Sequence, residues 1–263
     1  MKKSLKYLCF CIVTIVCLSC NGSVLDSPVP KSVAGYCLTF DDRYVTQWGS
    51  IKTLLDSNNV HATFFITDVS KLTSKEIDIV HSLQDYGNEI GCHSLKHLDA
   101  LEYLTKHSVQ EYIDSEVRPA VENFYKINIF PTAFSYPYGS TTDSLNASVL
   151  NYFRMLRTIA EEQRTGQVDN VETVESVFDK FNEKRIIAAL DIDFRFKISL
   201  AMIQQALYRA KNRNEIVIFY AHCPVDKVYS ASAYQVEKSF LRELFKMANE
   251  MGMKNYRFSE LVE

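Results

Sequence analysis

The sequence contains few of the residues that mark fibrous or low-complexity chains, with eight Gly, six Pro and a single Trp, Trp48, among 263 residues. A collagen-like or linker-like chain is therefore excluded. The sequence also lacks an excess of positive charge, because its formal net charge is −3, and this removes the electrostatic basis for binding nucleic acid. After the first twenty residues, no apolar run approaches the roughly 18 residues of a membrane-spanning helix. The remaining composition, 47% hydrophobic and 23% charged residues, predicts a globular domain with a large core.

The first twenty residues differ from the rest of the chain. Three Lys residues precede a short apolar segment, Leu8–Leu18, which is followed by Ser19 and Cys20. This pattern is typical of a secretory signal and resembles that of a bacterial lipoprotein, with Cys20 as the lipidated residue. We therefore expect three parts: a signal peptide at 1–19, a lipidated Cys and flexible tether at 20–33, and one domain at 34–263. The expected location is the bacterial cell envelope, with a lipid anchor on the periplasmic or cell-surface face. An ordinary secreted protein or a retained anchor is the alternative.

Four of the seven Cys residues belong to this leader, and the three that remain are Cys37, Cys92 and Cys223. Their spacing matches no zinc-binding motif. Each lies in an expected strand, which favours buried free thiols. A single disulfide in an oxidising periplasm is the alternative, and the sequence does not select a pair.

Apolar segments rich in β-branched and aromatic residues alternate with amphipathic segments from residue 34 onward. The expected strands are Ala34–Phe40, Val60–Thr67, Glu89–His93, Thr132–Tyr136, Met155–Ala160, Ile186–Asp191, Ile216–Ala221 and Asn255–Phe258. The main expected helices are Thr73–Tyr86, Ser108–Tyr125, Leu200–Asn212 and Ala233–Met251, with a loop insertion at Glu161–Lys184 that contains a short helix, Val171–Asn182. The alternation predicts an α/β fold of parallel βαβ units. A doubly wound sheet and a barrel both fit, because either buries apolar strands on both faces.

Polar side chains follow several of these strands, at the C-terminal ends where parallel α/β folds place their sites. Asp41 and Asp42 close the first strand. Adjacent carboxylates repel each other unless a cation or a proton separates them, and successive side chains of a strand point to different sides. One of the two could therefore bind a metal ion while the other handles a proton. The alternative is that one of them only caps the next helix.

Histidines follow two other strands. His93 and His97 are four positions apart, a spacing that on a helical turn lets two imidazoles share one ion. His222 ends the apolar strand that starts at Ile216, and Tyr138 lies in a Pro-Tyr-Gly turn that exposes backbone N–H groups. Solvated histidines are the alternative for the first pair. The other three histidines are expected to be ordinary core or surface residues.

These residues, in this order, resemble the motifs of the polysaccharide deacetylase family, which carries the NodB homology domain and forms carbohydrate esterase family four. The matching segments are Thr39–Asp42, Ala62–Phe65, His93–His97, Pro137–Gly139 and His222. The resemblance covers residues 34–263. It implies a distorted, incomplete (β/α) barrel with the site at the C-terminal ends of the strands.

The resemblance also implies a metal site. Asp42, His93 and His97 would hold one divalent ion, with Zn²⁺ expected and Co²⁺, Ni²⁺ or Mn²⁺ as alternatives. Two imidazoles and one carboxylate leave coordination positions for water and substrate, which is typical of a hydrolytic site. Such an ion activates water and polarises an acetyl carbonyl.

The remaining roles fall to residues that move protons or stabilise charge. By the resemblance, Asp41 would be the catalytic base, the backbone N–H of Tyr138 would stabilise the oxyanion, and His222 would protonate the leaving group. Ser135 lies where many members carry an Arg that pairs with the base, so we expect Asp41 to lack a cationic partner. The family's Asp-x-x-Asp-Trp motif, which orients the acid His, is also missing. Asp191 or Asp193 is the available substitute, and we favour Asp193.

The expected function is therefore a metal-dependent hydrolase that removes O- or N-acetyl groups from a polysaccharide in the cell envelope or outside the cell. Its expected partners are the acetylated polysaccharide and the membrane, through the lipid at Cys20, but not nucleic acid. The sequence identifies neither the glycan nor the oligomeric state. Two alternatives stay open: a glycan-binding lipoprotein without catalysis, and an amidohydrolase that acts on a small non-carbohydrate amide.

Overall fold

The computed structural model describes residues 33–166, 168–181 and 183–262. The expected signal peptide, the lipidated Cys20 and all of the expected tether except Val33 lie outside these residues. None of the described helices combines the length and the apolar character that a membrane span needs.

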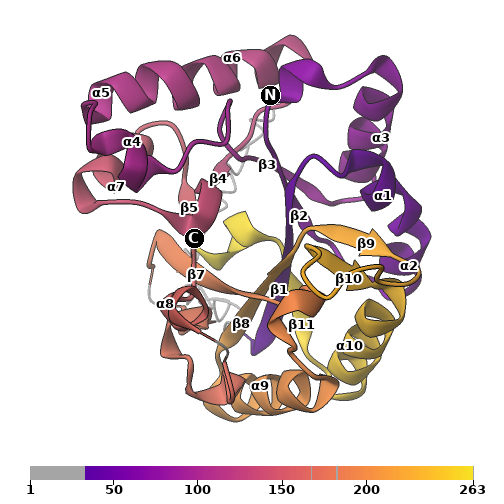
Figure 1. Ribbon diagram of the computed structural model, residues 1–263. Helices are drawn as coiled ribbons and strands as arrows, with labels where there is room; N and C mark the ends of the chain where they lie inside the picture. Colours follow the sequence, from indigo (N-terminus) through magenta and orange to yellow (C-terminus); the bar gives the residue numbers. More distant parts are fainter. Residues whose placement is uncertain (1–32, 167, 182, 263) are drawn as a thin grey trace, which may run out of the picture. The chain divides into compact units, whose positions relative to one another are not determined.

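Within the described residues, seven parallel strands form a closed ring in the order β1-β2-β3-β4-β5-β7-β8 (Figure 1). Their bounds are β1 (Gly35–Asp42), β2 (Thr63–Ile66), β3 (Glu89–Cys92), β4 (Ala133–Ser135), β5 (Met155–Ile159), β7 (Ile186–Asp191) and β8 (Ile216–Ala221). Pairing of β8 with β1, from Gly35 opposite Ile216 to Phe40 opposite Ala221, closes the ring. The expected α/β barrel is confirmed.

The ring is distorted in two places. β3 and β4 share a single paired position, Cys92 opposite Phe134, so the wall is weakly hydrogen-bonded there. β11 (Lys254–Tyr256) pairs with the first half of β1, and β2 pairs with its second half from Thr39 onward. The barrel therefore splays at the N-terminal end of β1 and is tighter at its C-terminal end.

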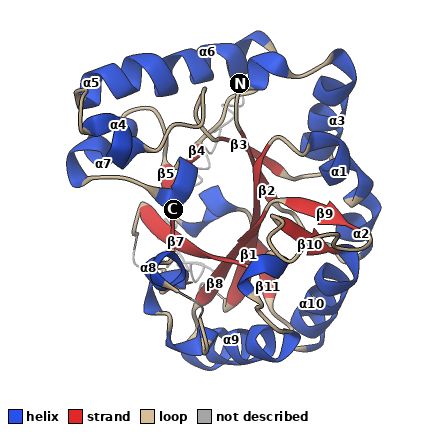
Figure 2. Ribbon diagram, viewed as in Figure 1, coloured by secondary structure: helices blue, strands red, loops and turns tan. Residues whose placement is uncertain are grey.

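The α-helices lie outside the ring of strands (Figure 2). Their bounds are α1 (Val45–Ser50), α2 (Lys52–Ser57), α3 (Ser74–Asp85), α4 (Ala100–Leu104), α5 (Val109–Tyr112), α6 (Arg118–Lys126), α7 (Asp143–Val149), α8 (Glu161–Thr165), α9 (Leu200–Arg213) and α10 (Lys238–Glu250). The start of α3 shows why they begin where they do: Thr73 and Glu76 form a reciprocal capping box that satisfies backbone N–H groups of the first turn. Short strands complete the fold: β6 (Phe178–Asp179), β9 (Cys223–Val225) and β10 (Gln235–Glu237).

The alternation of side chains along each strand decides which residues face the barrel interior. Cys37 and Met155 belong to a smaller buried apolar cluster, whereas Leu38 and Phe40 belong to the larger one packed beneath the helices. Asp41 is in phase with Cys37, and Arg157 is in phase with Met155. Both charged side chains therefore face the inside of the barrel, near its C-terminal mouth.

The expected strands are recovered with end shifts of a few residues, but two expected helices are wrong in part. The helix expected at Val171–Asn182 is replaced by two 3₁₀ turns and strand β6 over residues 171–179, and Asn182 lies outside the described residues. The helix expected from Ala233 starts only at Lys238, because Gln235–Glu237 pairs with β9 instead. Both errors fall where a short segment pairs with a distant strand, which a local periodicity cannot reveal. The three described cysteines are buried and free, as expected.

Candidate active site

The sequence-predicted site residues meet at the C-terminal mouth of the barrel, in a cleft of about 550 Å³. Asp41, Asp42, His93, His97, Tyr138 and His222 all line this cleft, although they come from four separate segments of the chain. The parallel strands explain this convergence, because their C-terminal ends open to one end of the ring.

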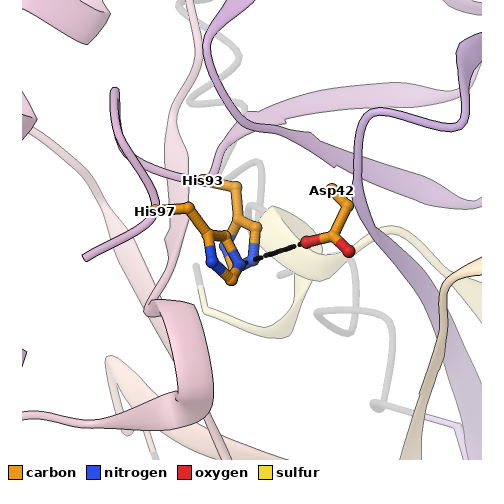
Figure 3. Close-up of side chains that lie close together, drawn as sticks. All are labelled: Asp42, His93 and His97. Atoms are coloured by element: carbon orange, nitrogen blue, oxygen red, sulfur yellow. Dashed lines mark ion pairs between the residues drawn. The ribbon is translucent and has the colours of Figure 1, made fainter. Parts of the chain in front are cut away.

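Asp42, His93 and His97 face one another at one side of the cleft (Figure 3). Oδ1 of Asp42 lies 3.1 Å from Nε2 of His97 and 3.6 Å from Nε2 of His93. One candidate ligand atom from each residue lies within 4.8 Å of the other two. Atoms this close could share one ion, since Zn²⁺ binds nitrogen and oxygen ligands at about 2.0–2.2 Å.

The surroundings of His93 fit the role of a metal ligand. Its Nδ1 lies 2.8 Å from the carbonyl oxygen of Ser135, which places the N–H on Nδ1 and leaves the lone pair of Nε2 toward Asp42. Burial, only partly opposed by the charge of Asp41, lowers the pKa of His93 to about 4. The imidazole is therefore neutral at physiological pH, the form that binds metal ions.

The chain is bent to bring these groups together. Asp42, Ser94 and His97 have φ angles of 81°, 64° and 59°, in the left-handed region that side chains with a Cβ seldom adopt. Because His93 and His97 flank a turn and not a regular helix, their approach depends on these backbone angles.

The histidines also affect the protonation of Asp42. Burial alone would raise the pKa of Asp42, but the hydrogen bond from His97 and the charges of the surrounding histidines hold this pKa below its usual range.

Asp41 does not lack a cationic partner, and that expectation is wrong. The guanidinium of Arg157, on β5, donates through Nη2 to Oδ2 of Asp41 and to Oγ of Ser135. Ser135 on β4 and Arg157 on β5 are directly paired positions. The small Ser side chain leaves room for the neighbouring Arg to reach across it. Arg157 and Asp41 are both buried, at 0% and 3% exposure.

The other oxygen of Asp41, Oδ1, is buried and has no hydrogen-bond partner among the described residues. Buried carboxylate oxygens are almost always hydrogen-bonded, and an exception calls for an explanation. Oδ2 accepts from Arg157 and from Oγ of Ser135, the latter at 3.5 Å, so Oδ1 remains able to accept a proton. This is the arrangement that a general base needs.

His222, at the end of β8, forms a second polar cluster with Asp191 and Asp193. Its Nδ1 lies 2.5 Å from Oδ2 of Asp193, whose Oδ1 accepts the backbone N–H of His222 at 3.2 Å. Asp191 contacts the backbone N–H of Asp193 instead, at 2.8 Å. The structure thus gives Asp193 as the hydrogen-bond partner of His222, whereas Asp191 lines the cleft beside them.

The pKa values of His222 and Asp191 are both raised in this cluster. Burial lowers the pKa of His222, but the hydrogen bond and charge of Asp193, with the charges of Asp191 and Asp42, raise it to about 10. Burial and the adjacent charge of Asp193 raise the pKa of Asp191 well above its ordinary value. His222 is therefore a charged imidazolium at neutral pH, able to give up a proton.

Sequence reasoning missed two residues that hold this cluster in place. Nε1 of Trp48, in α1, donates to the backbone carbonyl of His222 at 2.8 Å. Gln163, in the insertion, exchanges two hydrogen bonds with the backbone of Asp191, at 2.6 and 2.8 Å. No local sequence pattern predicts either of these contacts. The signal for Arg157 was present, because an Arg inside an apolar strand must be paired when it is buried.

Tyr138 lies in the turn after β4 with a φ of 58°, and its ring packs against His97 at 4.9 Å between centroids. The side chain is 54% exposed at the mouth of the cleft. The left-handed backbone of this residue sets the orientation of the peptide that was expected to carry the oxyanion donor.

The fold and the site define a class: an α/β barrel with a candidate metal triad, a buried carboxylate and a His–Asp pair at one mouth. Residues 29–154 match the family model of the polysaccharide deacetylases. The search of curated proteins found no match.

Solved structures show the same fold at low sequence identity. The peptidoglycan deacetylase PdaC from Bacillus subtilis is 20% identical, with a TM-score of 0.50 over 87% of this chain and 90% of that one. A CE4 family pseudoenzyme from Bacillus anthracis is 16% identical, with a TM-score of 0.55 over 88% of this chain and 66% of that one. A chitin deacetylase from the fungus Colletotrichum lindemuthianum is 15% identical, with a TM-score of 0.51 over 88% of each chain.

Proposed function

We propose that this protein is a metal-dependent hydrolase that removes O- or N-acetyl groups from a polysaccharide. The observation that supports the proposal is that one cleft holds both a group that can take a proton and a group that can give one. A buried carboxylate with a free oxygen, Asp41, lies beside the candidate metal ligands, and a charged His222 lines the same cleft. Hydrolysis of an ester or amide needs both a base for water and an acid for the leaving group.

Asp42, His93 and His97 would hold the ion, because they offer a carboxylate oxygen and two imidazole nitrogens within 4.8 Å of one another. Zn²⁺ is the ion we expect, with Co²⁺, Ni²⁺ and Mn²⁺ as alternatives that suit the same ligands. When bound, a divalent ion supplies Lewis acidity that activates water and polarises a carbonyl oxygen.

The chain's own residues would do the rest. Oδ1 of Asp41 takes the proton of the attacking water while Oδ2 accepts hydrogen bonds from Arg157 and Ser135. The backbone N–H of Tyr138 stabilises negative charge on the former carbonyl oxygen. His222, charged and oriented by Asp193, protonates the departing sugar oxygen or nitrogen.

The proposed location is the bacterial cell envelope, with the domain at 34–263 attached by a tether to a lipid on Cys20. An acetylated glycan of the envelope or of the surroundings would then be the substrate. Support for this location comes only from the leader, in which three Lys residues precede an apolar segment that ends before Cys20. Replacing Cys20 with Ser should release the protein from the membrane fraction or leave it unprocessed. Unchanged processing and membrane association would contradict the anchor.

Two alternatives compete with this function. A glycan-binding protein without catalysis is one, and the structural neighbour that is described as a pseudoenzyme is an example of this fold without activity. An amidohydrolase for a small amide is the other. The cleft of about 550 Å³ beside exposed aromatic side chains such as Tyr138 favours a sugar polymer.

A panel assay separates these functions. The metal-free protein is loaded in turn with Zn²⁺, Co²⁺, Ni²⁺ and Mn²⁺ and mixed with acetylated xylan, peptidoglycan and chitin oligosaccharides, and acetate release is measured. We expect release that depends on the metal and disappears in His97→Ala, whereas the control His81→Ala on α3 keeps full activity. Binding without release from any substrate would favour the non-catalytic protein, and ammonia from a small amide would favour the amidohydrolase.

A further inference from the structure

We propose that Arg157 is the positioning residue for the catalytic base, in place of an Arg on the neighbouring strand. This inference rests on the proposed function, since it concerns how Asp41 is held for proton transfer. Position 135, where the family resemblance calls for an Arg, is occupied by Ser. The guanidinium reaches the same carboxylate from β5, the next strand of the ring.

The register of β4 and β5 explains how an Arg on β5 can pair with Asp41 although position 135 on β4 carries Ser. Ser135 and Arg157 are paired positions on β4 and β5, and paired strands lie about 4.8 Å apart. An Arg side chain is longer than this distance. Ser135 leaves the space over β4 free and also binds the guanidinium through Oγ.

The guanidinium is fixed from several sides. Its Nη1 donates to the carbonyl oxygen of Thr158 at 3.3 Å, and its carbon lies 4.4 Å from the centre of the Tyr220 ring. The side chain is fully buried. Arg157 therefore has little freedom, and the single oxygen of Asp41 that it binds has little freedom as well.

The test uses Arg157→Met, Arg157→Ser and the relocated variant Ser135→Arg/Arg157→Ser, with circular dichroism to confirm folding. Metal affinity is measured from the fluorescence of Trp48, the only Trp of the chain, which contacts His222. For Arg157→Met we expect kcat to fall about 100-fold, with KM and metal affinity changed by no more than about threefold. The relocated variant should regain at least about tenfold in kcat over Arg157→Ser.

A second measurement does not depend on turnover. In urea unfolding of the metal-free protein, Arg157→Met leaves the buried Asp41 unpaired, so the double variant Asp41→Asn/Arg157→Met should unfold at a higher urea concentration than Arg157→Met alone. A double variant at a lower midpoint than either single variant would overturn the pairing. A folded Arg157→Met with native kcat, or one that loses metal affinity and kcat together, would overturn the positioning role. A native protein that releases no acetate overturns the proposed function itself, which is a distinct outcome.

A different observation points to the charge of the substrate, and from it we infer that the glycan carries an acidic group beside its acetylated position. Arg195 lines the cleft, and no described carboxylate forms an ion pair with it. Its guanidinium is stacked at 4.2 Å from the ring centre of Tyr234 and 4.9 Å from that of Phe196. Stacking holds the guanidinium plane while its N–H groups stay available for a carboxylate.

Arg195 also lies close to the acid end of the site. The ring of Tyr234 packs edge-on against His222, at 4.9 Å between centroids. One aromatic ring thus separates the guanidinium from the residue proposed to protonate the leaving sugar. An acidic group bound by Arg195 would belong to that sugar or to its neighbour in the chain. This inference also rests on the proposed function.

Matched substrates test it: an acetylated acidic oligosaccharide and the same oligosaccharide with its carboxylates converted to methyl esters. We expect the native enzyme to favour the acidic form by about tenfold in kcat/KM at low salt, and Arg195→Met to lose this preference. Arg118→Met, which removes an exposed Arg on α6 that pairs with Asp114, is the control and should keep it. Acidic oligosaccharide without acetyl groups should bind the native protein more tightly than Arg195→Met in calorimetry. Equal turnover of both substrate forms by the native enzyme, or equal loss of preference in the control, would overturn the inference, whereas no acetate release from either form would overturn the proposed function.

Discussion

The two ends of strand β8 each bury an arginine beside a carboxylate, but they treat the pair differently. At the start of the strand, Arg209 of α9 binds Glu215, with Nε 2.9 Å from Oε2. Near the end of the strand, Arg157 binds Asp41 beside Tyr220. Both arginines and both carboxylates are at most 5% exposed.

The first pair is fully satisfied. The guanidinium of Arg209 donates to Glu215, to the carboxylate of Glu175 at 2.7 Å and to the carbonyl oxygen of Glu172, and it stacks on Phe178 at 3.7 Å. These contacts fasten the insertion to α9. Neither carboxylate oxygen of Glu215 is without a partner, because Nε and Nη2 of Arg209 donate to the two of them.

The second pair is not satisfied. Oδ1 of Asp41 and Nε of Arg157 are both buried without a partner among the described residues. An unpaired buried polar atom costs about 1–3 kcal/mol, so a purely structural pair would not be expected to keep two of them. We interpret the incompletely bonded Arg157–Asp41 pair at the mouth as reactive and the Arg209–Glu215 pair at the base as structural.

The largest effect is expected for Asp41→Asn, at the reactive end. The amide keeps the shape of the carboxylate but cannot take a proton, so we expect acetate release to fall by at least about 1,000-fold, within the range assigned to a lost general base. Metal affinity should change little, because Asp42, His93 and His97 remain. Single-turnover kinetics and a metal titration check the two halves of this prediction. Near-native turnover would remove Asp41 from the chemistry.

Arg209→Met probes the other end of the same strand. It leaves Glu215 buried without its main partner, so we expect the free energy of unfolding to fall by about 3–5 kcal/mol. The kcat of the folded variant should stay within about twofold of the native value, because the change is remote from the cleft. Urea unfolding and kinetics at a temperature where the variant is folded measure both. A large loss of kcat without a loss of stability would contradict the division between reactive and structural ends.

The barrel was largely predictable because each strand carries its own apolar run between polar turns. Residues such as Asp41 and His222 could be placed at strand ends, and parallel strands necessarily bring those ends together. The short strands β6 and β10 were not predictable. Their pairing partners are distant in the chain, and segments of two or three residues have no period to read.

The site was predictable as a set of residues but not as a network. Ser135 was correctly noted as a departure, yet its partner across the strand pair, Arg157, depends on a register that the sequence does not state. The choice between Asp191 and Asp193 depends on side-chain direction within a turn. Trp48 acts through a side-chain bond to a backbone carbonyl, a contact that leaves no pattern in the sequence.

The contribution of Asp193 to the positive charge of His222 can be tested through the pKa of the imidazole. In the metal-free native protein the imidazole should stay protonated until the pH approaches its pKa of about 10. In Asp193→Asn, burial acts without the main opposing charge, so the pKa of His222 should fall by several units. Titration of the ring by NMR measures this shift. A pKa unchanged by the substitution would remove Asp193 as the partner that sets the charge.

The same pair has a consequence for stability. Because the pKa of His222 is raised on folding from about 6.5, its stabilising contribution is fully present below about pH 6.5. The contribution is lost as the pH rises through the folded value of about 10. We therefore expect the stability difference between the native protein and His222→Gln to shrink by up to a few kcal/mol between these values. A difference that stays constant across this range would contradict the raised pKa.

The smallest expected effect comes from Trp48→Phe, which tests whether His222 depends on the hydrogen bond that Trp48 donates to its backbone carbonyl. The tilted ring contact with Phe64, at 5.2 Å between centroids, is kept in kind, but the N–H that binds the carbonyl of His222 at 2.8 Å is lost. We expect the free energy of unfolding to fall by about 1 kcal/mol. Tyr36→Phe is the matched control, because it removes a buried hydroxyl that has no hydrogen-bond partner among the described residues and should cost nothing. If Trp48 supports the acid, kcat should also fall by about two- to fivefold while KM stays unchanged. Equal stability of the two variants in urea would show that the bond to His222 contributes no more than an unpaired hydroxyl, and the orientation of the acid would then rest on Asp193 alone.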